Sequence, residues 1–173
     1  GKSALVLVPE IGLTPQLMDR FRARFGDRYV NAYHSQLSDG ERFDTWRQML
    51  SGEPQIVIGT RSAVFAPLHQ IGLIILDEEH DSSFKQDRPQ PCYHARTVAQ
   101  WRAELEDCPL ILGSATPSTE MLYLVKTGAG LDKEYLTLPD RIGNKPMPPI
   151  TVVDMREELK SGNWSIFSRQ LQT

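Results

Sequence analysis

The chain has 173 residues, 40% of them hydrophobic, which is enough for one ordinary domain with a core. Its formal net charge of −3 excludes a strongly basic protein that coats nucleic acid, so contacts with nucleic acid would depend on locally placed donors. Two cysteines, Cys92 and Cys108, are too few for a disulfide framework or a cysteine-rich zinc site, and they fit a reducing cytoplasm.

Short aliphatic runs alternate with longer amphipathic stretches. The first run, residues 4–8, is far too short to cross a membrane, and no cleavable leader precedes it, so we expect a soluble, cytoplasmic protein. Runs that are apolar on both faces predict strands covered by helices on two sides, over residues 4–8, 55–58, 72–76 and 110–112, with a less apolar candidate at 29–33.

Helical patterns lie between these strands, over residues 13–25, 38–50, 93–105 and 118–126. Thr14 is the predicted N-cap of the first helix, and Pro15 stands at its first position. Ser38 and Glu41 have the spacing of a capping box. The alternation predicts an α/β fold with a parallel sheet and right-handed crossovers, whose ligands bind at the carboxyl ends of the strands.

Glycine and proline punctuate the last third of the chain. We therefore predict one α/β unit over residues 1–127, a connecting loop over 128–149, and the start of a further segment over 150–173. In that last segment we expect a strand at residues 150–154 and the beginning of a helix at 164–171.

The chain begins with Gly1-Lys2-Ser3, which matches the end of the phosphate-binding P-loop pattern G-x-x-x-x-G-K-[ST]. The P-loop needs a strand before it and a helix after it, so that backbone N–H groups cradle phosphates. Here a strand-like run follows at once, and Pro9 would break a helix. We interpret Gly1 and Lys2 as the turn that leads into the first strand.

The strongest signal is the run of residues 73–80, in which an aliphatic strand ends in Asp77-Glu78-Glu79-His80. A buried carboxylate is costly unless a positive charge lies beside it, and magnesium on nucleotide phosphates supplies that charge. Asp77 would hold the metal, mainly through water, and Glu78 would orient and deprotonate the attacking water. The alternative is a solvated acidic turn in which His80 is an ordinary surface histidine.

Other strand ends carry hydrogen-bonding groups. Ser114 and Thr116 can bond to a neighbouring carboxylate–histidine turn and sense the γ-phosphate, or they serve only to begin the next helix. Further candidates for phosphate contacts, which could equally be helix caps without a ligand, are Thr14, Gly59, Thr60 and Arg61.

Together these segments resemble superfamily 2 helicases, and among them the primosomal replication-restart DNA helicases of bacteria. Residues 7–16 look like motif Ia, 58–65 like motif Ib, 77–86 like motif II with its continuation, and 113–117 like motif III. The similarity reaches residues 153–156 and so covers nearly the whole chain.

The resemblance implies a partial RecA-like (P-loop NTPase) lobe of an ATP-dependent 3′→5′ DNA helicase that uses ATP and Mg²⁺. The implied partners are single-stranded and forked DNA, primosome proteins and single-stranded-DNA-binding protein. By the family pattern, Asp77 and Glu78 match the magnesium and water-activating pair. His80, Ser114 and Thr116 match the residues that couple the state of ATP to the binding of DNA. The residues that match DNA-backbone contacts are Thr14, Gly59, Thr60 and Arg61.

The resemblance also assigns residues 84–96 to an aromatic-rich loop that links DNA occupancy to ATP hydrolysis. In such loops an aromatic face stacks on a base while an arginine reaches phosphate. We therefore expect DNA contacts from Phe84, Lys85, Tyr93 and Arg96. The tryptophan often expected in this loop is absent, and Pro89 and Pro91 separate its two aromatic residues.

Three parts of such a motor are expected outside this chain. They are the P-loop, which the family places upstream of Gly1, the arginine fingers of the second lobe, and a cysteine-rich zinc insertion, so that no zinc is expected here. Without a P-loop, the carboxylate pair has little nucleotide to act on. We expect negligible ATPase activity from these residues alone and weak, salt-sensitive binding to single strands.

Two other functions fit the same residues. A non-catalytic module would keep the fold and only dock DNA or a partner, although it would have no need of buried acids. A metal-dependent phosphohydrolase would use Asp77, Glu78 and His80 directly as ligands, although no second ligand cluster follows another strand. The other histidines are isolated and are interpreted as structural or surface residues: His34, His69 and His94.

Overall fold

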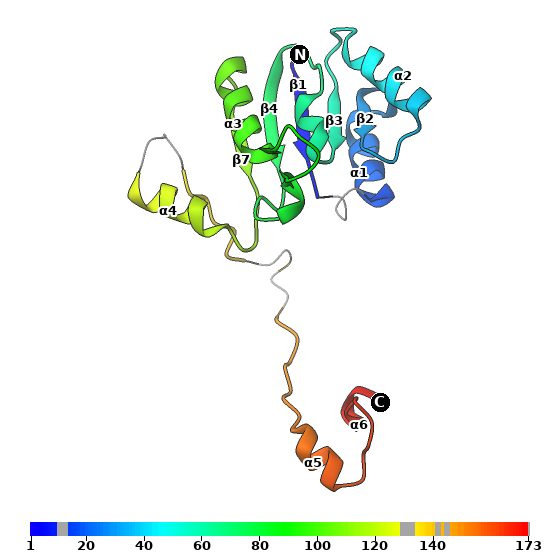
Figure 1. The fold of residues 1–173 in the computed structure, drawn as a ribbon, viewed down its shortest axis with the longest axis vertical. Coiled ribbons are helices and arrows are strands. Elements are labelled where there is room, and N and C mark those ends of the chain that lie inside the picture. Colours follow the sequence, from blue (N-terminus) through cyan, green and yellow to red (C-terminus); the bar gives the residue numbers. More distant parts are fainter. Residues whose placement is uncertain (10–13, 129–133, 141–142, 144–145, 173) are drawn as a thin grey trace. The chain divides into compact units, whose positions relative to one another are not determined.

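The computed structural model describes residues 1–9, 14–128, 134–140, 143 and 146–172. The chain divides into two compact units, residues 1–133 and 134–173. The first unit contains a parallel sheet of five strands in the order β2-β3-β1-β4-β7 (Figure 1). This confirms the predicted α/β fold. The strands are β1 (Ser3–Leu7), β2 (Val30–Tyr33), β3 (Ile56–Gly59), β4 (Ile71–Leu76) and β7 (Leu110–Leu112).

The predicted helices of the first unit are present. They are α1 (Pro15–Phe25), α2 (Asp39–Met49), α3 (Ala95–Glu106) and α4 (Thr119–Thr127), with the 3₁₀ turns η2 (Asp27–Tyr29), η3 (Arg61–Phe65) and η4 (Ser82–Phe84). Thr14 caps α1, and Ser38 and Glu41 form the capping box of α2, as predicted. Among the described helices, none is long and apolar enough to cross a membrane.

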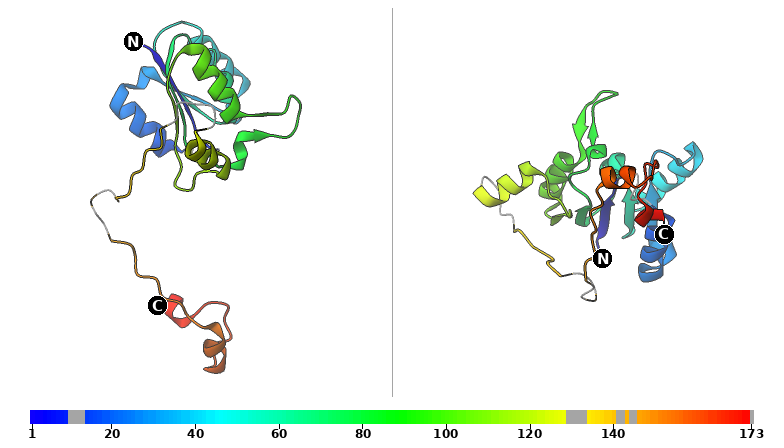
Figure 2. Two further views of the ribbon diagram at one scale, coloured as in Figure 1. Left: turned by 90° about the vertical axis from the view of Figure 1, so that its left-hand side faces the viewer. Right: turned by 90° about the horizontal axis from the view of Figure 1, so that it is seen from below.

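One helix boundary differs from the prediction. Residues 93–94, placed in a helix by the sequence, form the short strand β6 (Tyr93–His94), which pairs antiparallel with β5 (Lys85–Gln86). His94 then caps α3, because its side chain accepts a hydrogen bond from the Arg96 amide. The resulting hairpin projects from the body of the unit (Figure 2). His94 therefore has a structural role, as interpreted.

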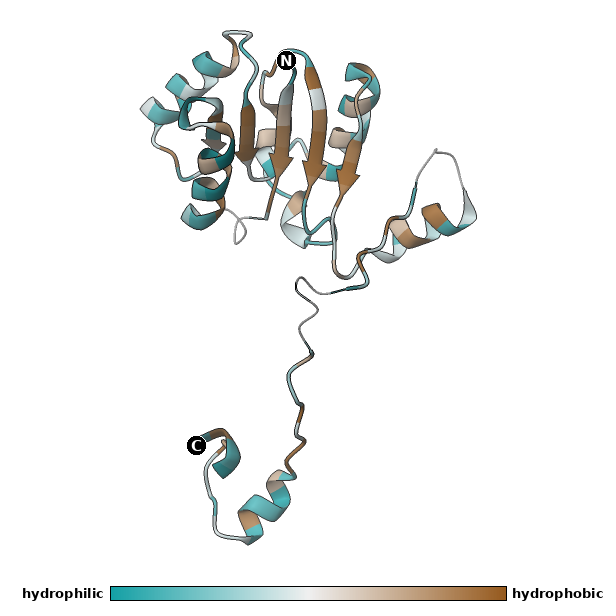
Figure 3. Cartoon of the chain, turned by 180° about the vertical axis from the view of Figure 1, so that it is seen from behind, coloured by the Kyte–Doolittle hydropathy of each residue, from teal (hydrophilic) through white to brown (hydrophobic). Residues whose placement is uncertain are grey.

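The two faces of the sheet are covered by different helices. Leu5 and Leu7 of β1 pack in a cluster with α2, α3 and η3, whereas Val6 and Val8 pack with Met18 of α1 on the other face. The ribbon views show helices on both sides of the sheet (Figure 2) and mostly hydrophobic residues along its strands (Figure 3). This alternation follows from the pleat of a strand, which sends successive side chains to opposite faces. The central strands are mostly apolar, as expected for strands with both faces covered.

The second unit departs from the predictions. Residues 150–154, predicted as a strand, pair with no strand in the described part of the chain, and Ile150 and Val152 are 84% and 91% exposed. Asp154 instead caps the helix α5 (Met155–Lys160). The helix predicted over 164–171 is limited to α6 (Arg169–Gln172). The finer division of the chain at residues 127 and 149 stays a prediction.

Candidate functional site

The candidate site lies where three neighbouring strands end. Backbone hydrogen bonds align the ends of these strands: the Asp77 amide donates to the Leu7 carbonyl at 2.9 Å, and the Gly113 amide donates to the Leu76 carbonyl at 2.9 Å. The acidic residues that follow β4 therefore stand between the segments that follow β1 and β7. This is the edge at which parallel α/β sheets bind their ligands.

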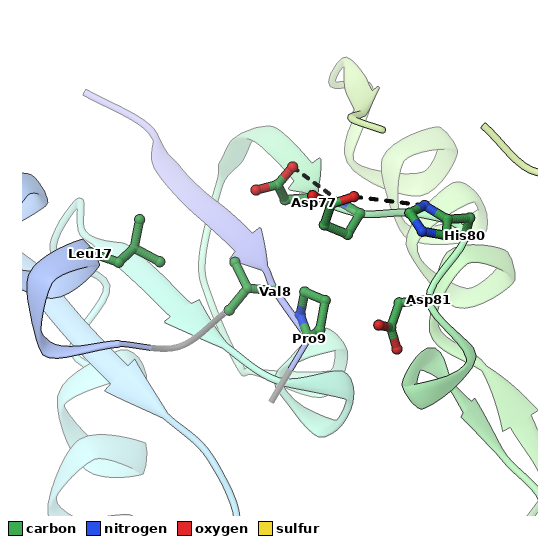
Figure 4. Close-up of a pocket in the computed structure, with 7 residues that line it drawn as sticks. Val8, Pro9, Leu17, Asp77, His80 and Asp81 are labelled. Atoms are coloured by element: carbon green, nitrogen blue, oxygen red, sulfur yellow. Dashed lines mark hydrogen bonds and ion pairs between the residues drawn. The ribbon is translucent and has the colours of Figure 1, made fainter. Parts of the chain in front are cut away.

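Asp77 and Glu78 face a cleft of about 440 Å³ beside Pro9 (Figure 4). Asp77 Oδ1 accepts a hydrogen bond from the Glu78 amide at 3.0 Å, and a Cβ at Gly113 would lie 3.0 Å from the same oxygen. Both acids are exposed to solvent. The argument that their burial demands a cation was therefore wrong. The full lining of the cleft is Val8, Pro9, Leu17, Asp77, Glu78, His80 and Asp81.

His80 joins this acidic turn to the segment after β7. Its Nδ1 lies 2.7 Å from Ser114 Oγ and 3.7 Å from Glu78 Oε2, and its Nε2 lies 3.4 Å from Thr116 Oγ1. The structure thus brings together the residues that the sequence assigned to the two motifs. The role of these contacts in coupling ATP state to DNA grip stays a prediction.

Glu79 is the buried acid of the turn Asp77-Glu78-Glu79-His80, and we predicted no role for it from the sequence. It is 2% exposed, and its carboxylate accepts hydrogen bonds from Arg96 Nη1 and from the Ser118 amide, each at 2.6 Å. Burial alone would raise the pKa of Glu79, but the bonds from Ser118 and Arg96 outweigh burial and lower that pKa. The charge that a buried carboxylate needs is therefore supplied by Arg96.

Several predicted DNA contacts have other partners. Phe84 is 0% exposed in the core, so the structure gives no support to the predicted stacking of its ring on a base. Arg96 Nη1 donates to Glu79 and to Ser118, and the predicted contact of this side chain with phosphate stays a prediction. Arg61 Nη1 donates to the Lys85 carbonyl at 2.9 Å and to the Ser83 carbonyl at 3.3 Å, so it holds the start of the hairpin. The partners of the two arginines stand between 17 and 24 positions away in the sequence, which is why the local pattern gave no sign of them.

The remaining predicted contacts lie nearer the surface or at the strand ends. Lys85 is exposed, and its Nζ lies 3.0 Å from Asp87 Oδ1. Tyr93 packs edge-on against Phe65 with ring centroids 5.0 Å apart.

Gly59 has no room for a side chain, because a Cβ there would lie 2.3 Å from the Tyr33 carbonyl oxygen. Thr60 donates its amide to that same carbonyl. Thr14 is exposed and caps α1. Contact between any of these residues and DNA stays a prediction.

The family model for DEAD/DEAH box helicases matches residues 1–124. The chain belongs to this family. The "Replication restart protein PriA" of Synechocystis sp. is 67% identical over 174 residues, and that of Bacillus subtilis is 50% identical over 171 residues. These matches cover 100% and 99% of this chain but only 21% of each relative. That of Treponema pallidum is 44% identical over 158 residues, which are 91% of this chain and 23% of the relative.

The chain thus spans about a fifth of the length of the curated relatives it matches. The resemblance to superfamily 2 helicases of replication restart is confirmed, and the predicted helicase fold with it. In this DEAD/DEAH helicase chain the acidic turn Asp77-Glu78-Glu79-His80 follows β4. This strand is the second from the β7 edge of the described sheet.

The residues present fit a magnesium ion held mainly by nucleotide phosphates. Mg²⁺ keeps several waters and uses only one or two protein carboxylates in such sites, and Asp77 stands exposed in the cleft for that role. Within the described ranges, no group of three or more His, Cys, Asp or Glu side chains is placed to hold a metal by itself. The alternative with Asp77, Glu78 and His80 as direct ligands therefore gains no support.

Proposed function

We propose that this chain belongs to the first motor lobe of an ATP-dependent 3′→5′ DNA helicase that acts in replication restart and primosome assembly. The observation that carries the proposal is that Asp77 and Glu78 end a central strand in a cleft, while His80 contacts both Ser114 and Thr116. The names of the relatives support the replication-restart role. The proposed partners are single-stranded and forked DNA, primosome proteins and single-stranded-DNA-binding protein.

The cleft residues have distinct roles in this proposal. Bound Mg²⁺ and ATP supply the reacting phosphoryl group and the positive charge that stabilises it. Asp77 would hold the ion, mainly through water. Glu78 orients the attacking water and accepts its proton on a carboxylate oxygen. His80 lies beside both Glu78 and Ser114. A movement of the segment after β7 would therefore shift the Glu78 carboxylate through His80.

The open side of β7 supports the proposal that a P-loop comes from another part of the longer protein. In the described sheet β7 pairs only with β4, and Ile111 of β7 is 50% exposed. A parallel strand added there would cover Ile111 and would end next to Ser114, close to the acids. We therefore propose that residues 1–173 alone hydrolyse ATP negligibly, because the phosphates lack their backbone cradle.

The test is the Glu78→Gln variant of the full-length protein. We expect DNA-stimulated ATP turnover to fall by roughly 10²-fold or more, because the base is lost, while nucleotide affinity changes little. Turnover is measured by phosphate release, and affinity by titration with a fluorescent nucleotide. Glu104→Gln, an exposed position on α3, is the matched control and should behave as the wild type. Unchanged turnover in Glu78→Gln would favour the non-catalytic docking module instead.

A further inference from the structure

An aromatic groove opens between α2 and the end of β2, the edge strand of the described sheet opposite β7 (Figure 1). The rings of Tyr33 and Trp46 lie 6.2 Å apart between centroids, at an angle of 46°. Phe43 is 61% exposed, so most of its ring is open to solvent. The volume of the groove is about 380 Å³, within the range of ligand pockets, and its lining is Tyr33, Asp39, Arg42, Phe43 and Trp46.

The groove adjoins residues for which we predict contacts with the DNA backbone. Tyr33 is the last residue of β2, and its carbonyl oxygen accepts a hydrogen bond from the Thr60 amide at 3.3 Å. Tyr33 is also paired with Gly59, the last residue of β3. The groove therefore lies at the carboxyl edge of the sheet, the edge that carries Asp77. A DNA strand that contacts Thr60 would pass next to it.

Two arginines flank Phe43 along α2. The guanidinium carbon of Arg47 lies 5.8 Å from the centroid of the Phe43 ring. Arg42 Nη1 lies 3.9 Å from Asp39 Oδ1 and both side chains are exposed, so this pair is weak and Arg42 can turn to another anion. A single strand of DNA offers the matching pattern, a flat base between two phosphates. Asp39 in the lining disfavours a phosphate inside the groove, so the neutral base is the part that enters.

We infer that this groove is a stacking site for an unpaired base of single-stranded DNA. The inference rests on the proposed function and deepens it, because it adds a contact with a base to the proposed contacts with the DNA backbone. Phe43 and Trp46 supply the rings, and Arg42 and Arg47 pair with the phosphates on either side. Every base has a π-face, so the site accepts any sequence. It excludes duplex DNA, in which the bases are already stacked and paired.

The experiment measures binding of the full-length protein, without nucleotide, to two fluorescent oligonucleotides of equal length by anisotropy titration. One is a thymidine oligonucleotide, and the other has the same sugar-phosphate backbone with every base removed. We expect Phe43→Ala to weaken binding of the thymidine strand by at least about five-fold and to leave binding of the abasic strand unchanged, because only stacking is lost. Phe43→Tyr, which keeps an aromatic face, should bind both strands as the wild type does.

Two further variants complete the set. Phe25→Ala is the matched control, because Phe25 is a 46% exposed phenylalanine on α1 that does not line the groove. It should bind both strands like the wild type. Arg42→Gln should weaken binding of both strands, because both keep their phosphates. It should also reduce the slope of log affinity against log salt concentration by roughly 0.7, the value for one phosphate contact on a single strand.

Two results would overturn the inference. Equal weakening of both strands by Phe43→Ala would mean that the ring supports the fold of α2 and not a base. Unchanged binding of both strands would leave the groove to a protein partner. The proposed function fails separately: if Glu78→Gln keeps full turnover, the motor assignment is wrong, whatever the Phe43 variants do. If Glu78→Gln abolishes turnover while Phe43→Ala binds the thymidine strand like the wild type, only the present inference fails.

Discussion

The successive carboxylates of Asp77, Glu78 and Glu79 have different surroundings. The backbone turns at Glu78, whose φ is 50°, a left-handed value that costs roughly 1–2 kcal/mol for a residue other than glycine. Asp77 and Glu78 face the solvent-filled cleft, whereas Glu79 points inward to Arg96 and Ser118. The same residue type is thus exposed to solvent at Glu78 and buried in an ion pair at Glu79.

The buried carboxylate predicts a specific response to acid. The pKa of Glu79 is lowered in the folded chain, because the bonds from Ser118 and Arg96 outweigh the effect of burial. The ionised Glu79 carboxylate therefore contributes its full stabilisation above about pH 4.3, the ordinary pKa of glutamate in an unfolded chain. This stabilisation is lost as the pH falls through the lower pKa that Glu79 has in the folded chain. Urea denaturation from pH 7 to pH 3 should show a steeper loss of unfolding free energy in the wild type than in Glu79→Gln. Equal slopes in the two proteins would contradict this prediction, and Glu104→Gln should follow the wild type.

The elements depend on local signals to different degrees. α2 buries only Met49 fully, and Phe43 and Trp46 on the same helix are 61% and 37% exposed. Tertiary packing therefore contributes little to this helix, and its capping box matters more. In β4 the reverse holds, because Ile74 and Leu76 are completely buried in the cluster that also contains residues of α3 and η3.

Replacing Ser38 by Ala should lower the free energy of unfolding by about 1 kcal/mol, because the Glu41 amide loses the oxygen to which it donates. Chemical denaturation followed by far-ultraviolet circular dichroism measures this loss. Ser35→Ala, at an exposed position outside the cap, is the matched control and should change stability by less than about 0.5 kcal/mol. A Ser38→Ala variant as stable as the control would show that α2 does not depend on its cap.

At the scale of the whole molecule, the core belongs to one unit. Both hydrophobic clusters consist of residues between Leu5 and Leu112, all in the first unit. The second unit contains α5 and α6, and Ser168 is its only buried residue in the described part of the chain. Cooperative unfolding should therefore be a property of the first unit.

A protein limited to residues 1–133 should unfold at nearly the same temperature as the whole chain. We expect its Tm to lie within about 4 °C, which corresponds to ~1 kcal/mol for a domain of this size. Thermal scans of both proteins by circular dichroism make the comparison. A larger drop in Tm would mean that residues 134–173 stabilise the sheet through contacts beyond those of the two clusters.

The sequence by itself determined the parallel sheet, the caps at Thr14 and Ser38, and the acidic turn at the end of β4, because these depend on residues a few positions apart. It also indicated that His80, Ser114 and Thr116 would meet, since neighbouring parallel strands end at the same edge. It failed at residues 150–154, which pair with no strand among the residues that the structure describes.

Only the tertiary structure decided which acid is buried, where Phe84 lies, and what Arg61 and Arg96 bind. The residues of the Glu79–Arg96 pair stand 17 positions apart, and Glu79 and Ser118 stand 39 apart. Nothing in the local pattern distinguishes Glu79 from its neighbours, because the difference arises from the arginine and the amide that the fold brings beside it. Burial and hydrogen-bond partners are properties of distant segments in contact, and they appear only once the chain is folded.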